Sequence, residues 1–295
     1  MPAPNVGSTV PRRQLGRELR ELRTASGLTM RAAAAELEWS EQKLWRIETG
    51  QTSMRRLDVR NMCDLYGAPS SLTDALIGLA AETKSRGWWH SYGDVIPEGF
   101  DVYISLEGAA ARLDIYQAEL VPGLFQTEAY ARTVMRSYSP DMTDDELERR
   151  VRLRLARQAL LTRADPPKVR VALSEPLLRR PVGGHNTMAG QLAHLMQVSE
   201  LPTVEVRIIP VEAGLHLGVL SGPFFVMRFP LRADGRESEP ATVYADGFTG
   251  DLYLDKPQEV ESYDRAFDDI WSRSLSEEAS RGLLSELAGR HEQHG

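Results

Sequence analysis

The sequence predicts two domains, a small mainly α-helical one at the N-terminus and a larger α+β one behind it. Two observations support this division. Residues 11–67 contain four short amphipathic segments at helical spacing, whereas the rest of the chain alternates helical segments with short β-rich runs bounded by Pro or Gly. At 295 residues the chain is long enough for two domains that each bury a core.

Charge is distributed unevenly along the chain. The net charge is −7, but residues 1–66 contain eleven Arg or Lys and eight Asp or Glu, so this part carries +3 and the remainder −10. The basic surface therefore belongs to the first domain. The single cysteine, Cys63, cannot form an intramolecular disulfide, and no leader or run of 18 apolar residues occurs. We expect a cytoplasmic protein without membrane association.

Residues 1–10 are expected to be a disordered arm before the first helix. Leu15, Leu19 and Leu22 then recur at i, i+4, i+7 among five arginines, which predicts an amphipathic helix that ends near Gly27.

Two short helices follow, separated by a tight turn. Thr29 is a suitable N-cap for a helix over Met30 to Leu37, and Ser40 for a helix over Glu41 to Thr49, which Gly50 ends. The third helix has Leu44 and Ile47 on its inner face. The side chains predicted to point outward from it are Glu41, Gln42, Lys43, Trp45 and Arg46.

A fourth helix, with Ser53 as its expected N-cap, completes the domain before Gly67. Its apolar positions are Val59, Met62, Cys63 and Tyr66, so Cys63 is predicted to be core. Arg55 and Arg56 oppose the dipole of its first turn, which indicates either a nearby anion such as a DNA phosphate or full solvation.

The run from Leu28 to Gly50 resembles the helix-turn-helix of the Cro/repressor (XRE) family, which implies DNA binding. The resemblance implies that Glu41, Gln42 and Arg46 approach bases in the major groove. Further DNA contacts are assigned to Thr29, Met30, Ser40, Lys43, Trp45, Arg55 and Arg56. Met30 and Trp45 depart from the residues usual in the family, so the sequence preference does not transfer. A four-helix bundle that binds proteins is the alternative.

Residues 68–90 are expected to connect the domains. Leu72, Ala75, Leu76 and Leu79 form one apolar stripe of a helix that ends near Arg86 and suits a dimer seam. Trp88, Trp89 and Tyr92 then form a core corner or the wall of a ligand site.

The second domain is expected to span 91–295. Thr143 opens a capping box for a long helix to about Leu161, whose arginines form a solvated face or a second DNA-binding face. The other predicted elements are strands Val169–Leu173, Val204–Ile209, Phe224–Phe229 and Thr242–Ala245, and helices Met188–Glu200, Gln258–Arg273 and Ser276–Arg290.

The segments from Pro122 to Arg132 and from Arg180 to Gly184, together with the first domain, resemble actinobacterial XRE regulators with a large C-terminal domain of unknown function. This group includes the WhiJ-like regulators of streptomycetes. The resemblance covers about residues 11–285. It implies a nucleoid-associated transcription regulator, such as a repressor, that is modulated by a small partner protein encoded nearby.

Enzyme chemistry has little support in the sequence, and no cofactor is expected. His185 and His194 lack metal-ligand spacing, His291 and His294 lie in an expected frayed tail, and the lone His216 in a glycine-flanked loop is expected to be structural or solvated. Val182 to His185 is predicted to be a plain turn rather than an anion cradle. Three functions remain open: a homodimeric regulator modulated by a partner protein, a regulator that senses a small molecule, and an enzyme carrying a DNA-targeting domain.

Overall fold

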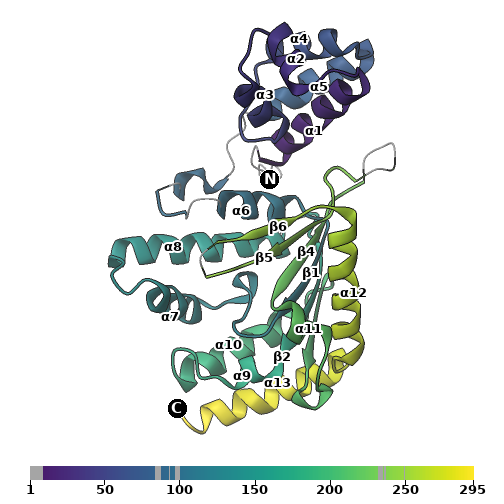
Figure 1. The fold of residues 1–295 in the computed structure, drawn as a ribbon. Coiled ribbons are helices and arrows are strands. Elements are labelled where there is room, and N and C mark those ends of the chain that lie inside the picture. Colours follow the sequence, from purple (N-terminus) through teal and green to yellow (C-terminus); the bar gives the residue numbers. More distant parts are fainter. Residues whose placement is uncertain are drawn as a thin grey trace. The chain divides into compact units, whose positions relative to one another are not determined.

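The computed structural model describes residues 9–83, 88–92, 94–96, 100–231, 235, 237–248 and 250–295 (Figure 1). They form two compact units. The first contains the described residues of Met1–Ser91, Phe100–Ala109 and Leu231–Glu239, and the second those of Tyr92–Gly99, Ala110–Pro230 and Pro240–Gly295. The predicted mainly α first part and α+β second part are confirmed. No helix in the described part of the chain is long and apolar enough to cross a membrane.

The first unit is built from short helices. They are α1 (Thr9–Ala25), α2 (Met30–Glu36), α3 (Glu41–Glu48), α4 (Arg56–Tyr66), α5 (Ser70–Glu82) and α6 (Phe100–Ala109), with the 3-10 helix η1 (Trp88–Tyr92) before α6. Residues 1–8 of the expected arm lie outside the described residues, while Thr9 and Val10 already belong to α1. Cys63 is fully buried in the core of the unit, and Trp89 is also buried.

The predicted N-caps hold for α2 and α3 but not for α4. The hydroxyls of Thr29 and Ser40 accept hydrogen bonds at 3.1 Å from the N–H groups of Ala32 and Lys43. Helix α4 instead begins at Arg56, with Arg55 as an N-cap that makes no side-chain cap hydrogen bond. The prediction of Ser53 as the cap is wrong. The backbone just before α4 is bound by a distant residue instead, since the N–H of buried Met54 donates to the Thr83 hydroxyl at 3.4 Å.

Helix α5 is the segment expected to connect the domains. It ends at Glu82, and its buried Leu76 and Ala80 belong to the same core cluster as α1, α3 and α4. The apolar stripe therefore packs inside the first unit, of which α5 is an integral helix.

A buried ion pair ties three parts of the first unit together. Arg23 at the end of α1 binds Glu48 of α3 through two hydrogen bonds, at 2.7 Å and 2.9 Å, and both side chains are largely excluded from solvent. The same guanidinium donates to the carbonyl of Leu28 in the α1–α2 turn at 2.8 Å. One side chain thus fixes the start of the two-helix motif and the end of α3.

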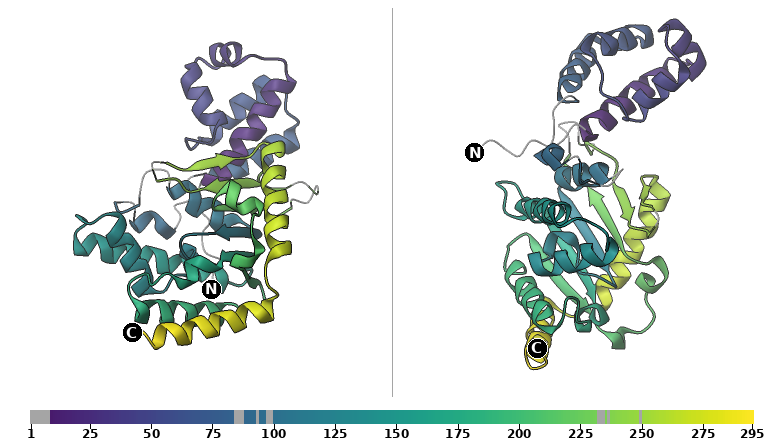
Figure 2. Two further views of the ribbon diagram at one scale, coloured as in Figure 1. Left: turned by 60° about the horizontal axis from the view of Figure 1, so that its bottom comes forward. Right: turned by 90° about the vertical axis from the view of Figure 1, so that its left-hand side faces the viewer.

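The second unit is an α+β fold with helices on both sides of one sheet (Figure 2). Its helices are α7 (Glu128–Tyr138), α8 (Asp144–Arg157), α9 (Glu175–Arg179), α10 (His185–Val198), α11 (Leu217–Ser221), α12 (Pro257–Arg273) and α13 (Glu277–Glu292), with 3-10 turns η2 (Gly123–Phe125), η3 (Gln158–Leu161) and η4 (Val211–Ala213). Figure 2 shows α12 on one side of the sheet and helices of the 120–200 region on the other. The last helix, α13, packs along α10 and against the edge strand β3.

The sheet has six strands in the order β3-β2-β1-β4-β5-β6. They are β1 (Arg112–Gln117), β2 (Lys168–Ser174), β3 (Val204–Ile209), β4 (Phe224–Arg228), β5 (Thr242–Ala245) and β6 (Leu252–Leu254). β1, β2 and β3 are parallel, and the other neighbours pair antiparallel. Strands β2 to β5 agree with the predicted runs to within a residue, whereas β1 and β6 were missed.

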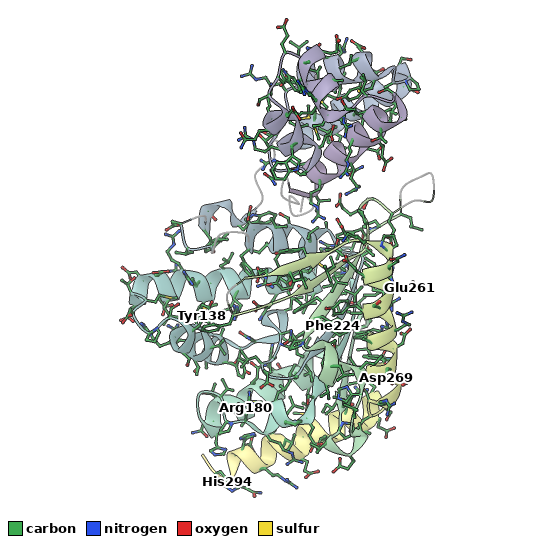
Figure 3. All side chains as sticks on the ribbon, viewed as in Figure 1. Tyr138, Arg180, Phe224, Glu261, Asp269 and His294 are labelled. Atoms are coloured by element: carbon green, nitrogen blue, oxygen red, sulfur yellow. The ribbon has the colours of Figure 1, made fainter. Side chains whose placement is uncertain are left out.

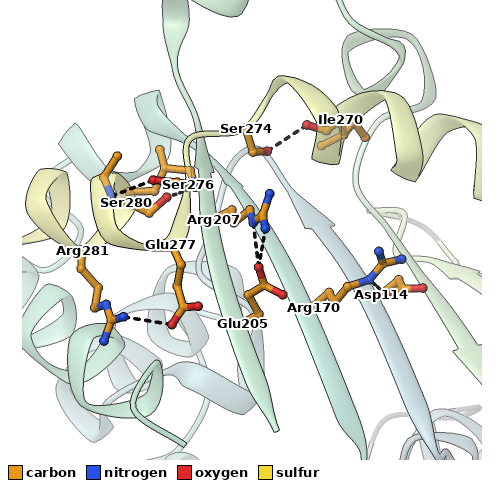
Figure 4. A network of polar contacts seen from close by, with 12 residues as sticks. Asp114, Arg170, Glu205, Arg207, Ile270, Ser274, Ser276, Glu277, Ser280 and Arg281 are labelled. Carbon is orange, nitrogen blue, oxygen red and sulfur yellow. Dashed lines mark hydrogen bonds and ion pairs between the residues drawn. The ribbon is translucent and has the colours of Figure 1, made fainter. Parts of the chain in front are cut away.

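The missed central strand β1 carries a buried charge. Asp114 is 2% exposed and interrupts the apolar pattern that identifies an interior strand. Its carboxylate binds Arg170 of β2 at 2.6 Å and Arg112 at 2.9 Å, and Arg170 also lies over the Phe267 ring of α12. Figure 4 shows this polar group beside the Glu205–Arg207 pair of β3. The register of β1 with β2 places Arg170 beside the buried carboxylate, and Arg112 of the same strand adds a second cation, which makes the burial tolerable.

The C-terminal residues are docked rather than frayed, so that expectation is wrong. Ser276 caps α13 by accepting from the Ala279 N–H, and Ser280 accepts from the N–H of Ile208 on β3 at 3.0 Å. His291, near the end of the helix, is buried.

We predict that Glu48→Ala destabilises the first unit by about 3–5 kcal/mol, because it leaves the buried Arg23 charge without its partner. Denaturant unfolding of the full chain measures the change. The matched double variant Arg23→Met/Glu48→Leu should cost less than Glu48→Ala alone, since it removes both charges. A loss below about 1 kcal/mol in Glu48→Ala would contradict the role of the pair.

Candidate nucleic-acid interface

The turn between α2 and α3 is tight and contains one residue in the left-handed region. Glu38 has φ 55°, and the N–H of Trp39 donates back to the carbonyl of Ala34 at 2.8 Å. This hydrogen-bond pattern closes the C-terminus of α2 in the way that glycine usually permits. It turns the chain so that α3 starts only a few residues after α2 ends.

The inner face of α3 is firmly packed. Leu44 and Ile47 are buried, and Gly16 of α1 lies directly against the end of α3, because a Cβ at that position would come within 2.4 Å of the Ile47 carbonyl oxygen. Close backbone contact and the Arg23–Glu48 pair together leave α3 little freedom to shift.

The outer face of α3 is exposed where the sequence predicted it. Glu41, Gln42 and Arg46 are exposed, and Trp45 is 48% exposed. Amide and guanidinium groups on one rigid helix are the donors and acceptors that recognise base edges. That these three polar side chains read bases stays a prediction.

The other predicted contact residues fall into different environments. The exposed Thr29 and Ser40 use their hydroxyls as caps at the starts of α2 and α3. Met30 is partly buried and packs on the core. The ammonium of Lys43 lies 3.5 Å from the centre of the Trp39 ring, so an aromatic residue that sequence reasoning did not single out orients it. No local pattern signalled this contact, because Trp39 precedes the N-cap of α3 and lies outside the helix.

Many arginines of α1 are engaged inside the first unit. Arg17 binds the fully buried Glu239 through two hydrogen bonds, at 3.0 Å and 2.9 Å, and Arg13 lies 3.6 Å from the same carboxylate. Arg12 donates to the Thr83 carbonyl. The basic composition of the first domain therefore overstates its accessible positive charge.

Arg20 of α1 is exposed, and further exposed arginines lie on other helices. Arg55 and Arg56 at the start of α4 are exposed, as are Arg31 on α2 and Arg60 on α4, which sequence reasoning did not single out. A guanidinium near a helix start is unfavourable beside the dipole and favourable beside a phosphate.

The arginine row of α8 in the second unit is used mainly within that unit. Arg149 pairs with Asp94, Arg150 with Glu146, and Arg154 donates to the Gln126 side chain at 2.8 Å. Arg157 is buried. These contacts favour a structural role over a second DNA-binding face.

The segment that follows Pro122 is held by buried amides. Gln191 of α10 accepts from the Thr127 N–H at 2.8 Å and donates to the Phe125 carbonyl at 2.6 Å, while Gln126 donates to the Val121 carbonyl. This segment is thus a structural junction of η2, α7 and α10.

His216 is a structural cap. Its Nδ1 accepts a hydrogen bond from the Gly218 N–H at the start of α11, and burial lowers its pKa, which favours the neutral acceptor form. Gly183 and Gly184 form the predicted turn before α10, both with positive φ. In the described part of the chain, no group of three or more His, Cys, Asp or Glu side chains is placed to hold a metal ion.

Two family models match the chain. A helix-turn-helix domain matches residues 14–76, which contain α2, the turn and α3. No curated protein matches the chain. The helix-turn-helix match indicates a DNA-binding regulator. The second model covers residues 100–286, more than half of the chain, and the chain therefore belongs to the family described as "Domain of unknown function (DUF5753)".

Proposed function

We propose that this chain is a sequence-specific transcription regulator, acting as a homodimeric repressor, with α3 as the helix that enters the major groove. The observation that carries the proposal is the combination of a packed inner face and an exposed polar outer face on α3, within a region that matches a helix-turn-helix domain. A recognition helix needs both features, because specificity requires side chains held in fixed positions.

The homodimer follows from the size of one helix-turn-helix. A single small motif spans one half-site, and tight binding generally uses two, about 34–36 Å apart on the DNA. Residues 211–222 of the second unit offer a surface for pairing, since they contain one charged residue, Glu212, in a chain that is 26% charged. Their exposed aliphatic side chains are Val211 (58%), Leu215 (70%), Leu217 (40%), Val219 (59%) and Leu220 (72%). Charge depletion with apolar exposure is typical of the centre of a protein interface.

We further propose that the second unit receives the regulatory signal. A small partner protein encoded nearby is the first candidate, in keeping with the resemblance to actinobacterial regulators, and a small molecule is the second. With either candidate signal, the second unit binds a regulator and does not catalyse a reaction. A pulldown with the intact chain from its native host separates the two.

Arg46→Ala should weaken operator binding by about 1–3 kcal/mol and relax the preference at one base position, because a guanidinium that bridges two acceptors of guanine is removed. Binding selections with randomised operators measure both effects. Glu36→Ala, at an exposed site on α2, is the control. Unchanged selectivity in Arg46→Ala would remove Arg46 from the base-reading set.

Replacing Arg55 and Arg56 by Ala should weaken binding to all DNA sequences alike. The slope of log affinity against log salt should become shallower by about one for each phosphate that is no longer neutralised. Fluorescence anisotropy at several salt concentrations gives the slope. An unaltered slope would show that both arginines are only solvated.

Leu220→Glu should disrupt the dimer and leave the fold intact, because the side chain is already exposed. We expect the dimer dissociation constant to rise roughly 30-fold or more, corresponding to about 2 kcal/mol. Sedimentation of the full chain measures it, with the exposed Leu252→Glu as the control. A monomeric wild-type chain would overturn the homodimer, whereas a Leu220→Glu variant that still dimerises would place the interface elsewhere.

A further inference from the structure

Three histidines from two distant parts of the second unit's sequence lie together. His185 is the first residue of α10, His291 is in the last turn of α13, and His294 follows that helix. The Nδ1 atoms of His185 and His291 are 2.9 Å apart, and the His294 ring stacks on the His185 ring with centroids 5.5 Å apart. Figure 3 shows His294 at the end of α13, on the same side of the unit as Arg180.

Backbone contacts determine which nitrogen of His291 carries a lone pair. Its Nε2 lies 3.1 Å from the carbonyl oxygen of Leu178, and a carbonyl can only accept, so Nε2 carries the proton. In the neutral ring the bare lone pair is then on Nδ1, which faces His185. The Nδ1 of His294 is instead engaged with the Arg290 carbonyl at 2.7 Å, so that nitrogen is not a ligand in the proposed site. Histidines that bind metals are commonly oriented by a carbonyl acceptor on the other ring nitrogen.

We propose that His185 and His291 bind one transition-metal cation of the Zn²⁺, Cu²⁺ or Ni²⁺ class through their Nδ1 atoms, with water completing the coordination. Imidazole donors without carboxylates select these cations over Mg²⁺ and Ca²⁺. Two nitrogens on a tetrahedral Zn²⁺ ion at its usual bond length are about 3.3 Å apart, so the two Nδ1 atoms need to separate by a few tenths of an ångström, and each ring has to turn so that its lone pair points at the ion.

Binding requires one change of protonation within the pair. Without metal, His185 donates its Nδ1 proton to the bare Nδ1 of His291. With metal, the proton of His185 resides on Nε2 instead, which a half-exposed ring reaches by exchange with water, so no proton is gained or lost overall. The ion would link the start of α10 to the end of α13 and stabilise the docked C-terminal helix by mass action.

The test uses the full chain after removal of metals with a chelator. Titration calorimetry with Zn²⁺ should show one site, and electron paramagnetic resonance of the Cu²⁺ form should show coupling to two nitrogens. His185→Ala, which removes a half-exposed ligand, should weaken Zn²⁺ binding about 10–100-fold or more. His294→Ala is the matched control and should retain binding within a few-fold.

Two further measurements do not depend on substitution of the buried His291. Nitrogen-15 spectra of the metal-free chain should show His291 protonated at Nε2, and Zn²⁺ should slow hydrogen exchange in the last turn of α13. Absence of a one-to-one site for both Zn²⁺ and Cu²⁺, or equal affinity in His185→Ala and wild type, would overturn the proposal. None of these outcomes bears on DNA binding.

Discussion

The first unit depends on the buried pair between Arg23 and Glu48. The unit is small, and its helices are too short to be stable alone, so the position of α3 has to come from tertiary contacts. The pair supplies a bidentate contact to α3, and the bond from Arg23 to the Leu28 carbonyl extends it to the turn before α2. Directional hydrogen bonds fix a helix more narrowly than apolar packing does, which matters for a helix whose outer face is proposed to meet bases.

A second buried carboxylate joins distant parts of the chain to the same unit. The described residues of Leu231–Glu239 follow β4 and precede β5, yet they belong to the first unit, where Glu239 binds Arg13 and Arg17 of α1. The helix-turn-helix therefore sits in a unit that is not continuous in sequence. The contact also engages two arginines that composition alone would assign to DNA.

Buried polar contacts also fix the positions of helices and strands in the second unit. Asp114 lies in the middle of the sheet and is tolerated because Arg170 of the neighbouring strand β2 and Arg112 of its own strand bind it. Gln191 ties α10 to the segment before α7, and Ser280 ties α13 to β3. Residues 211–222 expose several aliphatic side chains with little charge, which is why we propose that they pair with a partner copy.

Local patterns in the sequence determined most of the helices, four of the six strands and the exposed face of α3, because hydrophobic periodicity and capping residues act over a few positions. Thr29, Ser40 and Thr143 all cap the helices that they were predicted to cap. Only the tertiary structure determined the features that depend on contacts between residues far apart in the chain. The strand β1 was hidden because Asp114 looks like a surface residue until Arg170 is placed beside it. Helix α4 begins later than predicted because the Thr83 hydroxyl binds the Met54 N–H. His185 and His291 are in contact only because α13 packs along α10. In each case the deciding contact joins residues far apart in the chain, which no local pattern can encode.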